Sequence, residues 1–349
     1  MTLSLPYVPP IEKDAFTRVW ADLNAKTKPP GSLGQLEELA ARLFALHPMG
    51  EAPRAAVVLF AADHGVAEEG VSAYPQEVTM QMLTNFSRGG AAINALCGAA
   101  DADLYVVDVG THGATPPGVR DQKIRRGSAN MTRAPAMSLE DTEAALGVGL
   151  RLADELAGNG YDLIGLGEMG IGNTTSATAL TAALLQCPVE RVLGNGTGIS
   201  DRQRAHKGEI VERALRRHGG SRPPLDWLAR VGGLELAALV GLALGAAHHR
   251  RAVVLDGFIT GAAALAACRL VPTCVEYCFA SHLSAEPGHA LILEALALKP
   301  LLRLDLRLGE GSGAALSLPL FRAAAHVYHR MATFESAGVS RAERGELQP

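Results

Sequence analysis

The 349-residue chain has few cysteines, few aromatic residues and no excess of positive charge. Its 32 Lys and Arg against 36 Asp and Glu give a net charge of −4. This balance argues against a nucleic-acid-binding protein, which normally carries a basic surface. Five Cys residues are too few for a disulfide scaffold. Cys274 and Cys278 lie four residues apart, but no second pair has metal-site spacing, so ordinary reduced thiols are expected.

The sequence also lacks a recognisable leader and a long apolar run. Residues 1–10 have no basic flank followed by apolar residues, so no signal peptide is expected. The longest apolar window, residues 232–247, is shorter than about 18 residues and carries Glu235, which favours a buried helix over a membrane span. Hydrophobic residues make up 48% of the chain, which is ample for a large core. We therefore expect a soluble, cytoplasmic protein.

Short runs of β-branched residues and Leu recur along the chain and predict strands. They cover residues 56–60, 104–109, 162–166, 252–255 and 275–279, with a weaker run at 302–308. Helix-like stretches lie between most of them, at residues 78–96, 138–156, 175–185, 202–217, 234–248 and 261–270. Apolar strands that alternate with helices are typical of a parallel sheet covered on both faces. The sequence thus predicts a doubly wound α/β domain over about residues 50–285.

The two chain ends have a different pattern. Residues 11–46 have a helical pattern that is broken at Lys28-Pro29-Pro30-Gly31, and residues 313–336 predict another helix. We expect residues 1–49 and 286–349 to form a small, mainly helical domain.

Polar residues beside glycine follow most of the predicted strands. Asp63 and His64 follow the first, Glu168 the third and Asp256 the fourth. In open parallel sheets, ligands bind outside the carboxyl ends of the strands. The repetition at several strand ends predicts a binding site at that edge.

Three Gly-rich turns suggest close backbone approach to a ligand. The first, Gly165-Leu166-Gly167-Glu168-Met169-Gly170, runs into Asn173-Thr174-Thr175 at a predicted helix start. The others are Gly194-Asn195-Gly196-Thr197-Gly198 and Gly309-Glu310-Gly311-Ser312-Gly313. Each could be a tight turn with a helix cap. Taken together they favour a phosphorylated ligand, because N–H groups at a helix N-terminus bind anions.

The first turn also matches the G-x-G-x-x-G pattern of dinucleotide-binding folds. Such folds place an acid about 20 residues further on, after the next strand, to hold the ribose. Glu190 has about that offset but precedes the next apolar run, so it supports this alternative poorly. No G-x-x-x-x-G-K-[ST] motif is present, which disfavours a P-loop nucleotidase.

Several titratable residues allow two interpretations. Glu168 and Glu310 lie in Gly-rich turns and are either solvated turn residues or, in a closed pocket, usable bases near neutral pH. Asp63 and His64 could form an acid/base pair, but one His and one Asp do not make a metal site. Lys207 is either a solvated lysine or a phosphate ligand.

The sequence resembles one family, the nicotinate-nucleotide–dimethylbenzimidazole phosphoribosyltransferases of cobalamin synthesis. The matching segments occur in the family's order and span most of the chain. They are Lys28-Pro-Pro-Gly-Ser-Leu-Gly34, Ala62-Asp-His-Gly-Val66, Gly167-Glu-Met-Gly-Ile-Gly-Asn-Thr-Thr175, Leu255-Asp-Gly-Phe258, Ser281-His-Leu-Ser-Ala-Glu286 and Arg307-Leu-Gly-Glu-Gly-Ser-Gly-Ala314. Each segment alone is weak evidence, but together they are specific.

The resemblance implies a reaction and an architecture. Phosphoribose would move from nicotinate mononucleotide to a benzimidazole-type base, giving α-ribazole 5′-phosphate and nicotinate. It further implies a Rossmann-like large domain, a small domain built from both chain ends, and a homodimer. No metal and no cofactor are implied, since the leaving group is already a cationic pyridinium.

The resemblance also implies roles for individual residues. Glu310 matches the catalytic base, and Glu168 matches a second functional acid that orients the ribose or stabilises positive charge on it. Positions associated with the phosphoribosyl group are Gly170, Asn173, Thr174, Thr175, Lys207 and Ser284, to which we add Gly196, Gly309 and Gly311 of the Gly-rich turns. Met169 and Leu308 match positions that flank the acceptor base.

Two residues depart from the family pattern. Tyr74 and Met82 stand where the family members compared carry Ser and Gln, at positions that contact the acceptor base. Their side chains favour flat aromatic contact over hydrogen bonding. The acceptor could therefore be dimethylbenzimidazole, another benzimidazole, adenine or a phenol.

Two other function classes remain as alternatives at this point. An NAD-dependent oxidoreductase would use the first Gly-rich turn to bind its cofactor. A catalytically silent nucleotide sensor would need neither Glu168 nor Glu310, so the presence of both disfavours it.

Overall fold

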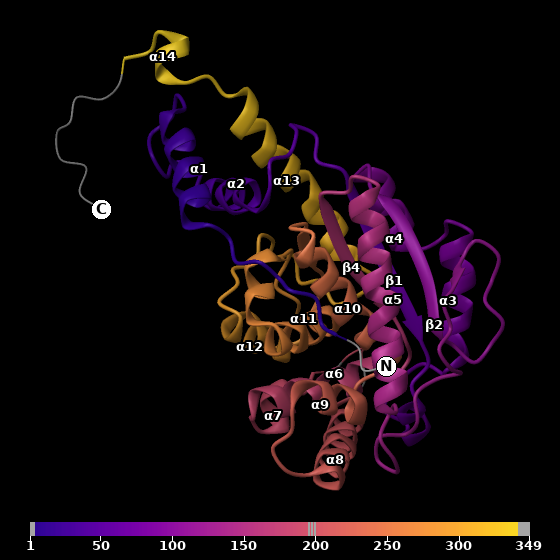
Figure 1. Cartoon of the computed structure of the whole chain (residues 1–349). Coiled ribbons are helices and arrows are strands. Elements are labelled where there is room, and N and C mark those ends of the chain that lie inside the picture. Colours follow the sequence, from indigo (N-terminus) through magenta and orange to yellow (C-terminus); the bar gives the residue numbers. More distant parts are fainter. Residues whose placement is uncertain (1–3, 195, 197, 199, 341–349) are drawn as a thin grey trace. The chain divides into compact units, whose positions relative to one another are not determined.

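A computed structural model describes residues 4–194, 196, 198 and 200–340 of the chain (Figure 1). Its contacts divide the chain into two compact units. Of the described residues, the larger unit contains those within 4–9 and 54–318, and the smaller one those within 10–53 and 319–340. The division falls within one helix, α13 (Ser312–Arg330).

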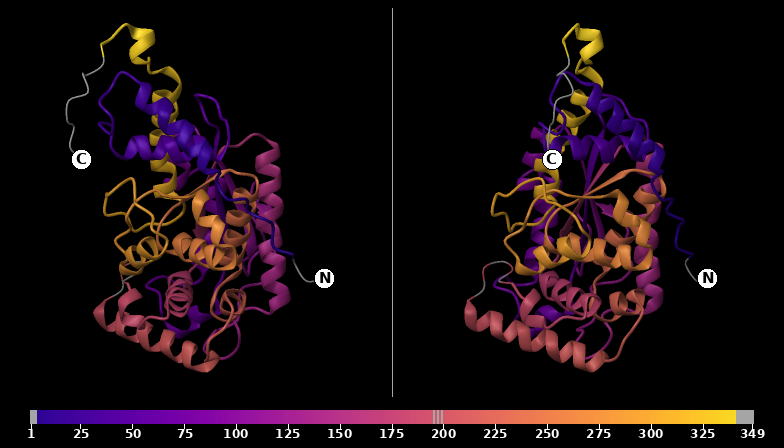
Figure 2. Two further views of the ribbon diagram at one scale, coloured as in Figure 1. Left: turned by 60° about the vertical axis from the view of Figure 1, so that its left-hand side comes forward. Right: turned by 90° about the vertical axis from the view of Figure 1, so that its left-hand side faces the viewer.

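The larger unit contains a six-stranded sheet in which all neighbouring strands are parallel. The strand order is β3-β2-β1-β4-β5-β6, and Figure 2 shows the strands side by side at the centre of this unit. This is the order of Rossmann-type folds. The strands are β1 (Ala55–Ala62), β2 (Asp103–Gly110), β3 (Arg120–Asp121), β4 (Leu163–Met169), β5 (Ala252–Leu255) and β6 (Cys278–Ala280).

The central strands are apolar on both faces. All eight residues of β1 are buried, although successive side chains of a strand point to opposite faces. Both faces of the sheet must therefore be covered at β1. This explains why its sequence is a continuous apolar run rather than an alternating one.

Helices connect the strands of the larger unit. They are η1 (Gly65–Glu69), α3 (Glu77–Ser87), α4 (Ala92–Ala99), α5 (Leu139–Gly158), α6 (Asn173–Leu185), α7 (Val189–Val192), α8 (Asp201–His218), α9 (Pro224–Val231), α10 (Leu234–His248), α11 (Phe258–Leu270), η2 (Pro272–Tyr277) and α12 (Pro287–Ala295). The first part of α13 completes this unit. Residues near the N-terminus belong to it as well, since the Tyr277 hydroxyl donates a hydrogen bond to the carbonyl of Pro9 (2.7 Å).

Helices α5 and α10 pack closely through glycine. A Cβ atom on Gly241 of α10 would lie 2.0 Å from the carbonyl oxygen of Leu146 in α5. One on Gly149 of α5 would lie 2.0 Å from the carbonyl oxygen of Ala238 in α10. The two backbones can approach this closely only because both residues lack a side chain.

The smaller unit combines α1 (Lys13–Ala25), α2 (Gln35–Leu46), the second part of α13 and α14 (Phe334–Ala337). Phe44 of α2 stacks on Tyr328 of α13, with ring centroids 4.1 Å apart. Between α1 and α2, the buried Lys28 amine pairs with Glu37 at 2.7 Å. The same carboxylate accepts hydrogen bonds from the N–H groups of Gly31 and Leu33, which fixes the predicted helix break.

The predicted α/β fold class is confirmed, but several boundaries differ. The helix expected over residues 78–96 is two helices, α3 and α4, because Gly89 with a φ of +77° interrupts it. Residues 302–308 form no strand, and only an isolated bridge pairs Leu302 with His282. The run at residues 275–279 begins in η2, so β6 starts at Cys278. The two-residue strand β3 has no apolar run and was not predicted.

The domain division expected from the sequence also differs from the observed units. Residues 286–318 lie in the larger unit, not with the chain ends. One reason is that α12 packs on α7: a Cβ atom on Gly288 would lie 2.7 Å from the Val192 side chain.

No helix among the described residues has the length and hydropathy needed to cross a bilayer. The apolar window at residues 232–247 falls largely within α10, whose residues 234–247 are all buried.

Replacing Gly241 by Ala is expected to lower the free energy of unfolding by about 2–4 kcal/mol, because the new Cβ would collide with α5 backbone. Helix propensity alone predicts a gain of about 1 kcal/mol. Chemical denaturation shows whether the substitution lowers or raises the free energy of unfolding. Gly98→Ala in α4 is the control, since no atom of the described residues that could obstruct a Cβ lies within 4 Å of its position. Equal stability changes in the two variants would contradict the packing explanation.

Candidate functional site

The strand order singles out one place at the carboxyl edge of the sheet. The connections run in opposite directions from β1 and β4, which are neighbours, and ligands of such sheets bind at this switch point. In the register of the pair, Phe60 lies beside Glu168 and Ala61 beside Met169. The residues that follow β1 and β4 therefore meet at the carboxyl edge, as the sequence predicted.

Glu168 lies at the end of β4 and is only 5% exposed. Its Oε2 atom accepts a hydrogen bond from the Asn173 side-chain amide. Burial raises the pKa of Glu168 to about 8, and the negative charges of Asp256, Glu235 and Glu310 act in the same direction. The carboxyl group therefore holds a proton at neutral pH in the ligand-free protein.

Glu310 occupies an unusual backbone conformation. Its φ is +64°, in the left-handed region that non-glycine residues rarely adopt, and Gly309 and Gly311 on either side have φ values of +85° and +87°. The turn also lies against β4, because a Cβ atom on Gly167 would be 2.7 Å from the Glu310 carbonyl oxygen. A Cβ atom on Gly309 would be 2.5 Å from Oε1 of Glu168, so the two acids belong to one site.

The carboxylate of Glu310 has a free acceptor atom. The residue is 7% exposed, and its Oε2 is buried without a hydrogen-bond partner in the described part of the chain. Burial raises the pKa of Glu310, and a backbone hydrogen bond from Ile93 opposes this rise. A buried carboxylate with raised proton affinity and an unpartnered oxygen can accept a proton from a bound ligand.

Asp256, directly after β5, holds the turn that carries Glu310. Its carboxylate accepts hydrogen bonds from the N–H groups of Gly311 (3.1 Å), Gly313 (2.6 Å) and Ala314 (3.3 Å). Burial raises the pKa of Asp256 to about 7, although these hydrogen bonds favour its charged form. The carboxylate also lies at the start of α13, where the helix dipole favours negative charge.

The N-terminus of α6 forms a second part of the site. Thr174 is half-buried, and Thr175 and Asn173 are buried. Lys207 of α8 is 1% exposed, and its Nζ donates a hydrogen bond to Thr174 Oγ1 (3.0 Å). Burial lowers the pKa of Lys207 to about 8, with the charge of Glu286 opposing. An amine, a hydroxyl and a helix N-terminus in one place suit an anionic group such as phosphate.

Gly196 and Ser284 lie close to this part. The Gly196 N–H donates a hydrogen bond to Oε1 of Glu286 (2.8 Å), and Ser284 Oγ accepts one from the Glu286 N–H (3.3 Å). A Cβ atom on Gly196 would lie 3.5 Å from Lys207 Nζ. Asn195 and Thr197 of the same predicted loop lie outside the described residues.

Asp63 and His64 do not form the acid/base pair considered from the sequence. Asp63 accepts hydrogen bonds from the N–H and Nδ1 of His112 (2.8 and 2.9 Å). The fully buried His64 bonds Glu235 through Nε2 (2.6 Å) and Ser176 of α6 through Nδ1 (3.0 Å). Because a Cβ atom on Gly170 would be 3.2 Å from the His64 ring, this residue supports the turn before α6.

The four residues assigned to the acceptor base are less enclosed. Tyr74 and Leu308 are 53% and 55% exposed, and Met82 and Met169 are half-buried. Helix α3, which carries Met82, reaches the turn after Met169, because the Ile171 N–H donates to Thr79 Oγ1 (3.0 Å). Leu308 directly precedes Gly309, which contacts Glu168.

Comparison with known proteins identifies the family. A family model described as "Phosphoribosyltransferase" matches residues 8–339. The chain belongs to this phosphoribosyltransferase family. It is 50% identical over 322 residues to a nicotinate-nucleotide–dimethylbenzimidazole phosphoribosyltransferase of Halalkalibacterium halodurans, covering 91% of this chain and 90% of the relative. The enzyme of the same name from Thermus thermophilus is 51% identical over 335 residues, covering 95% and 100%.

A solved structure agrees with these sequence relatives. The crystal structure of CobT from Thermus thermophilus has a TM-score of 0.90 to this chain at 50% identity, and covers 94% of this chain and all of that one. The chain is thus a transferase, and the resemblance found in the sequence motifs is confirmed.

The oxidoreductase alternative is not supported, and the fold explains why the G-x-G-x-x-G match misled. Gly165 and Gly167 lie inside β4 rather than in a strand-to-helix turn. Because both residues lack a side chain, Ala314 and the turn that carries Glu310 can pack against the strand. Protein atoms therefore fill the space that a pyrophosphate would need. Glu190 lies in the short helix α7 and not at a strand end.

Sequence reasoning assigned no role to Glu235 and Asp256 of this candidate site, and it considered His64 only as part of an acid/base pair with Asp63. For Asp256 and His64 the sequence offers one signal, the position of each polar residue directly after a predicted strand. For Glu235 the sequence shows only that a charged residue lies within an apolar window. Its partner His64 is 171 residues away in the chain, so no spacing could connect the two.

The raised pKa of Glu168 predicts how stability changes with pH. Its value of about 8 exceeds the ordinary 4.5, so between these values the unfolded state is ionised while the native state keeps its proton. This group therefore makes stability fall as pH rises through that window. Glu168→Gln should remove its contribution and, at about pH 9, raise the unfolding free energy by about 2–4 kcal/mol relative to wild type.

Denaturation at several pH values measures this effect. Exposed Glu190, replaced by Gln, provides the control. Parallel stability curves for Glu168→Gln and wild type would mean that Glu168 is not held protonated.

Proposed function

We propose that this chain transfers phosphoribose from nicotinate mononucleotide to 5,6-dimethylbenzimidazole or a related base, giving α-ribazole 5′-phosphate and nicotinate. The observation that carries the proposal is the buried Oε2 of Glu310, which has no hydrogen-bond partner among the described residues and lies next to Glu168 at the carboxyl edge of the sheet. The names of the two relatives support the same reaction. The product would supply the nucleotide loop of cobalamin.

The phosphate of the donor would bind at the N-terminus of α6. Thr174, Thr175 and Lys207 supply hydroxyls and a cation, and burial lowers the pKa of Lys207 to about 8. A phosphate dianion beside the amine would favour its charged form, so donor binding and lysine protonation support each other. The remaining contacts to the phosphoribosyl group are assigned to Gly170, Asn173, Gly196, Ser284, Gly309 and Gly311.

In the reaction, one ring nitrogen of the base attacks the ribose anomeric carbon while the bond from that carbon to the pyridinium nitrogen breaks. The bonding electrons return to the pyridinium ring, so nicotinate leaves as a neutral pyridine. Glu310 accepts the proton from the other nitrogen of the base. Attack from the face opposite nicotinate inverts the β-nucleotide to the α-product.

Glu168 would act on the ribose. It carries a proton in the free protein because burial and neighbouring acids raise its pKa to about 8. A cationic pyridinium nucleotide would favour its ionised form. The carboxylate could then stabilise the positive charge that develops on the ribose as the glycosidic bond breaks.

The acceptor base would lie between Tyr74, Met82, Met169 and Leu308. These side chains offer flat and polarisable apolar contacts rather than hydrogen bonds. A purine or a phenol is therefore a reasonable alternative acceptor, and a phenol would itself supply the attacking oxygen. Comparing nicotinate release with a benzimidazole, adenine and a phenol tests the preference.

The proposed reaction assigns no metal and no cofactor, since the leaving group is already cationic and needs no activation. We also propose that the protein is a cytoplasmic homodimer that acts on small molecules. Light scattering and cell fractionation test these two points.

Glu310→Gln is expected to lower kcat by about 10²–10⁴-fold, because the variant cannot accept the proton. The KM for nicotinate mononucleotide should change little. The assay follows base-dependent nicotinate release and identifies the nucleotide by mass, with Glu190→Gln as the control. Since burial raises the pKa of Glu310, wild-type kcat should fall on acidification at a pH above the ordinary glutamate range. Unchanged turnover in Glu310→Gln would remove its role as base.

Lys207→Ala is expected to raise the KM for nicotinate mononucleotide by about 10–100-fold, since one charge-assisted phosphate contact contributes about 1.5–3 kcal/mol. The paired change Thr174→Ala with Thr175→Ala should act in the same direction. Exposed Lys299 replaced by Ala is the matched control. A donor KM equal to that of wild type would place the phosphate elsewhere. Donor binding without release of nicotinate under any acceptor would instead indicate a nucleotide sensor.

A further inference from the structure

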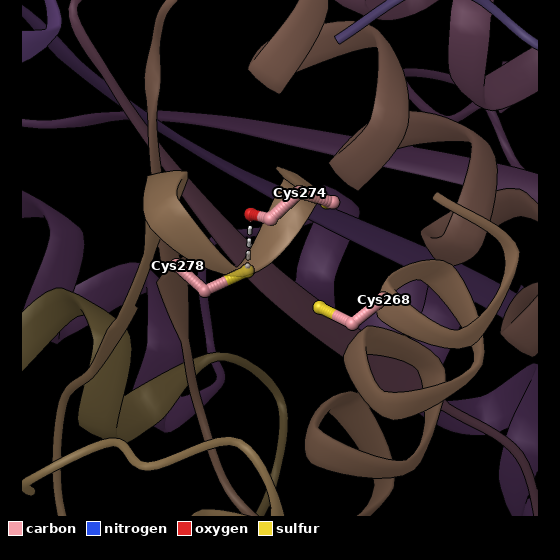
Figure 3. A group of neighbouring side chains, drawn as sticks. All are labelled: Cys268, Cys274 and Cys278. Atoms are coloured by element: carbon pink, nitrogen blue, oxygen red, sulfur yellow. Dashed lines mark hydrogen bonds between the residues drawn. The ribbon is translucent and has the colours of Figure 1, made fainter. Parts of the chain in front are cut away.

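Three of the five cysteines meet at one point in the larger unit. Cys268 comes from α11, Cys274 from η2 and Cys278 from the start of β6 (Figure 3). Their sulfur atoms all lie within 4.8 Å of one another. The sequence showed only the pair Cys274 and Cys278, and it is the turn between α11 and β6 that brings Cys268 to them.

The cluster is enclosed. Cys274 and Cys278 are fully buried, and Cys268 is 8% exposed. The Cys274 thiol donates a weak hydrogen bond to the carbonyl of Ala243 in α10 (3.8 Å), and the Cys278 thiol donates one to the carbonyl of Cys274 (3.4 Å). The thiols therefore lie among α10, α11, η2 and β6.

The sulfur spacing fits a central metal ion. Metal–thiolate bonds of about 2.3 Å place three sulfurs roughly 4 Å apart around one ion. The observed sulfur separations, all within 4.8 Å, are close to this value. A disulfide requires two of the sulfurs to approach to about 2.05 Å and would leave the third unused.

The ligand set selects the type of ion. Thiolates bind soft ions such as Cu(I) and Zn(II) in preference to hard ones. Structural zinc sites use four protein ligands. The cluster found among the described residues offers three side chains, all sulfur. A three-coordinate, all-sulfur set suits monovalent copper better than zinc.

We propose that Cys268, Cys274 and Cys278 form a three-thiolate binding site for a soft monovalent metal ion, with Cu(I) as the ion it takes. On binding, three copper–sulfur bonds form and three thiol protons leave to solvent, with no change in oxidation state.

The site is separate from the proposed transferase chemistry. Cys278 begins β6 and pairs with Val253, whereas Asp256 follows the carboxyl end of the neighbouring strand. A bound ion would join α11, η2 and β6. It should therefore stabilise the fold, because a ligand that binds only the native state raises the unfolding temperature.

The test uses the full chain, reduced and freed of metal, titrated anaerobically with Cu(I) against a colorimetric Cu(I) chelator. We expect one ion per chain by native mass spectrometry, a thiolate-to-copper absorption band, and a higher unfolding temperature. Cys268→Ser should weaken Cu(I) binding by more than about 100-fold, since even an outer-shell partner contributes about 10–100-fold.

Cys97→Ser is the matched control, since Cys97 is a buried free cysteine on α4 outside the cluster. It should bind Cu(I) like wild type, and Cys268→Ala replaces Cys268→Ser if the latter does not fold. Phosphoribosyl transfer by the Cys268 variant should be retained, which separates this site from the proposed function.

Three results would overturn the proposal. The first is the absence of stoichiometric Cu(I) binding, and the second is equal binding by wild type and the Cys268 variants. The third is tighter binding of Zn(II) than of Cu(I), which would mean that a fourth ligand completes the site.

Discussion

The candidate site depends most on the contact between the carboxylate of Asp256 and the backbone of the turn that carries Glu310. Three N–H groups converge on this one side chain. They join the end of β5 to the start of α13, and so hold Glu310 in a left-handed conformation that it would otherwise avoid. Because that turn also lies against Gly167 and Glu168, the three buried acids belong to one site.

This arrangement gathers three carboxyl groups in a poorly hydrated place. Glu168, Asp256 and Glu310 all have raised pKa values, and burial is the largest cause in each case. Such a site is costly for the free protein, since ionised carboxylates lose their water. It is suited to a ligand that brings positive charge, and a pyridinium nucleotide does so. The phosphate end of the same ligand would meet Lys207, the buried cation of the site.

The proposed copper site would use the same sheet for a different purpose. Catalytic residues of parallel sheets collect where strands end, because loops there can vary without changing the core. The cluster lies where β6 begins, among packed helices. An ion bound at that position would therefore act on the stability of the fold rather than on a substrate.

The sequence by itself determined the α/β class and the family, and it predicted the carboxyl-edge location of the candidate site, because apolar strand runs and short motifs such as Gly167-to-Thr175 are local signals. Tertiary structure decided the features for which the sequence has no local signal, namely strand pairing, long-range partners and burial. Residues 302–308 have strand-like composition but no strand to pair with, and Gly165 and Gly167 belong to a strand rather than a phosphate loop. The partners His64 and Glu235, and Cys268 with Cys278, meet only because the fold brings separate segments of the chain together. Side-chain burial, which sets the proton affinity of Glu168, likewise exists only in the folded chain.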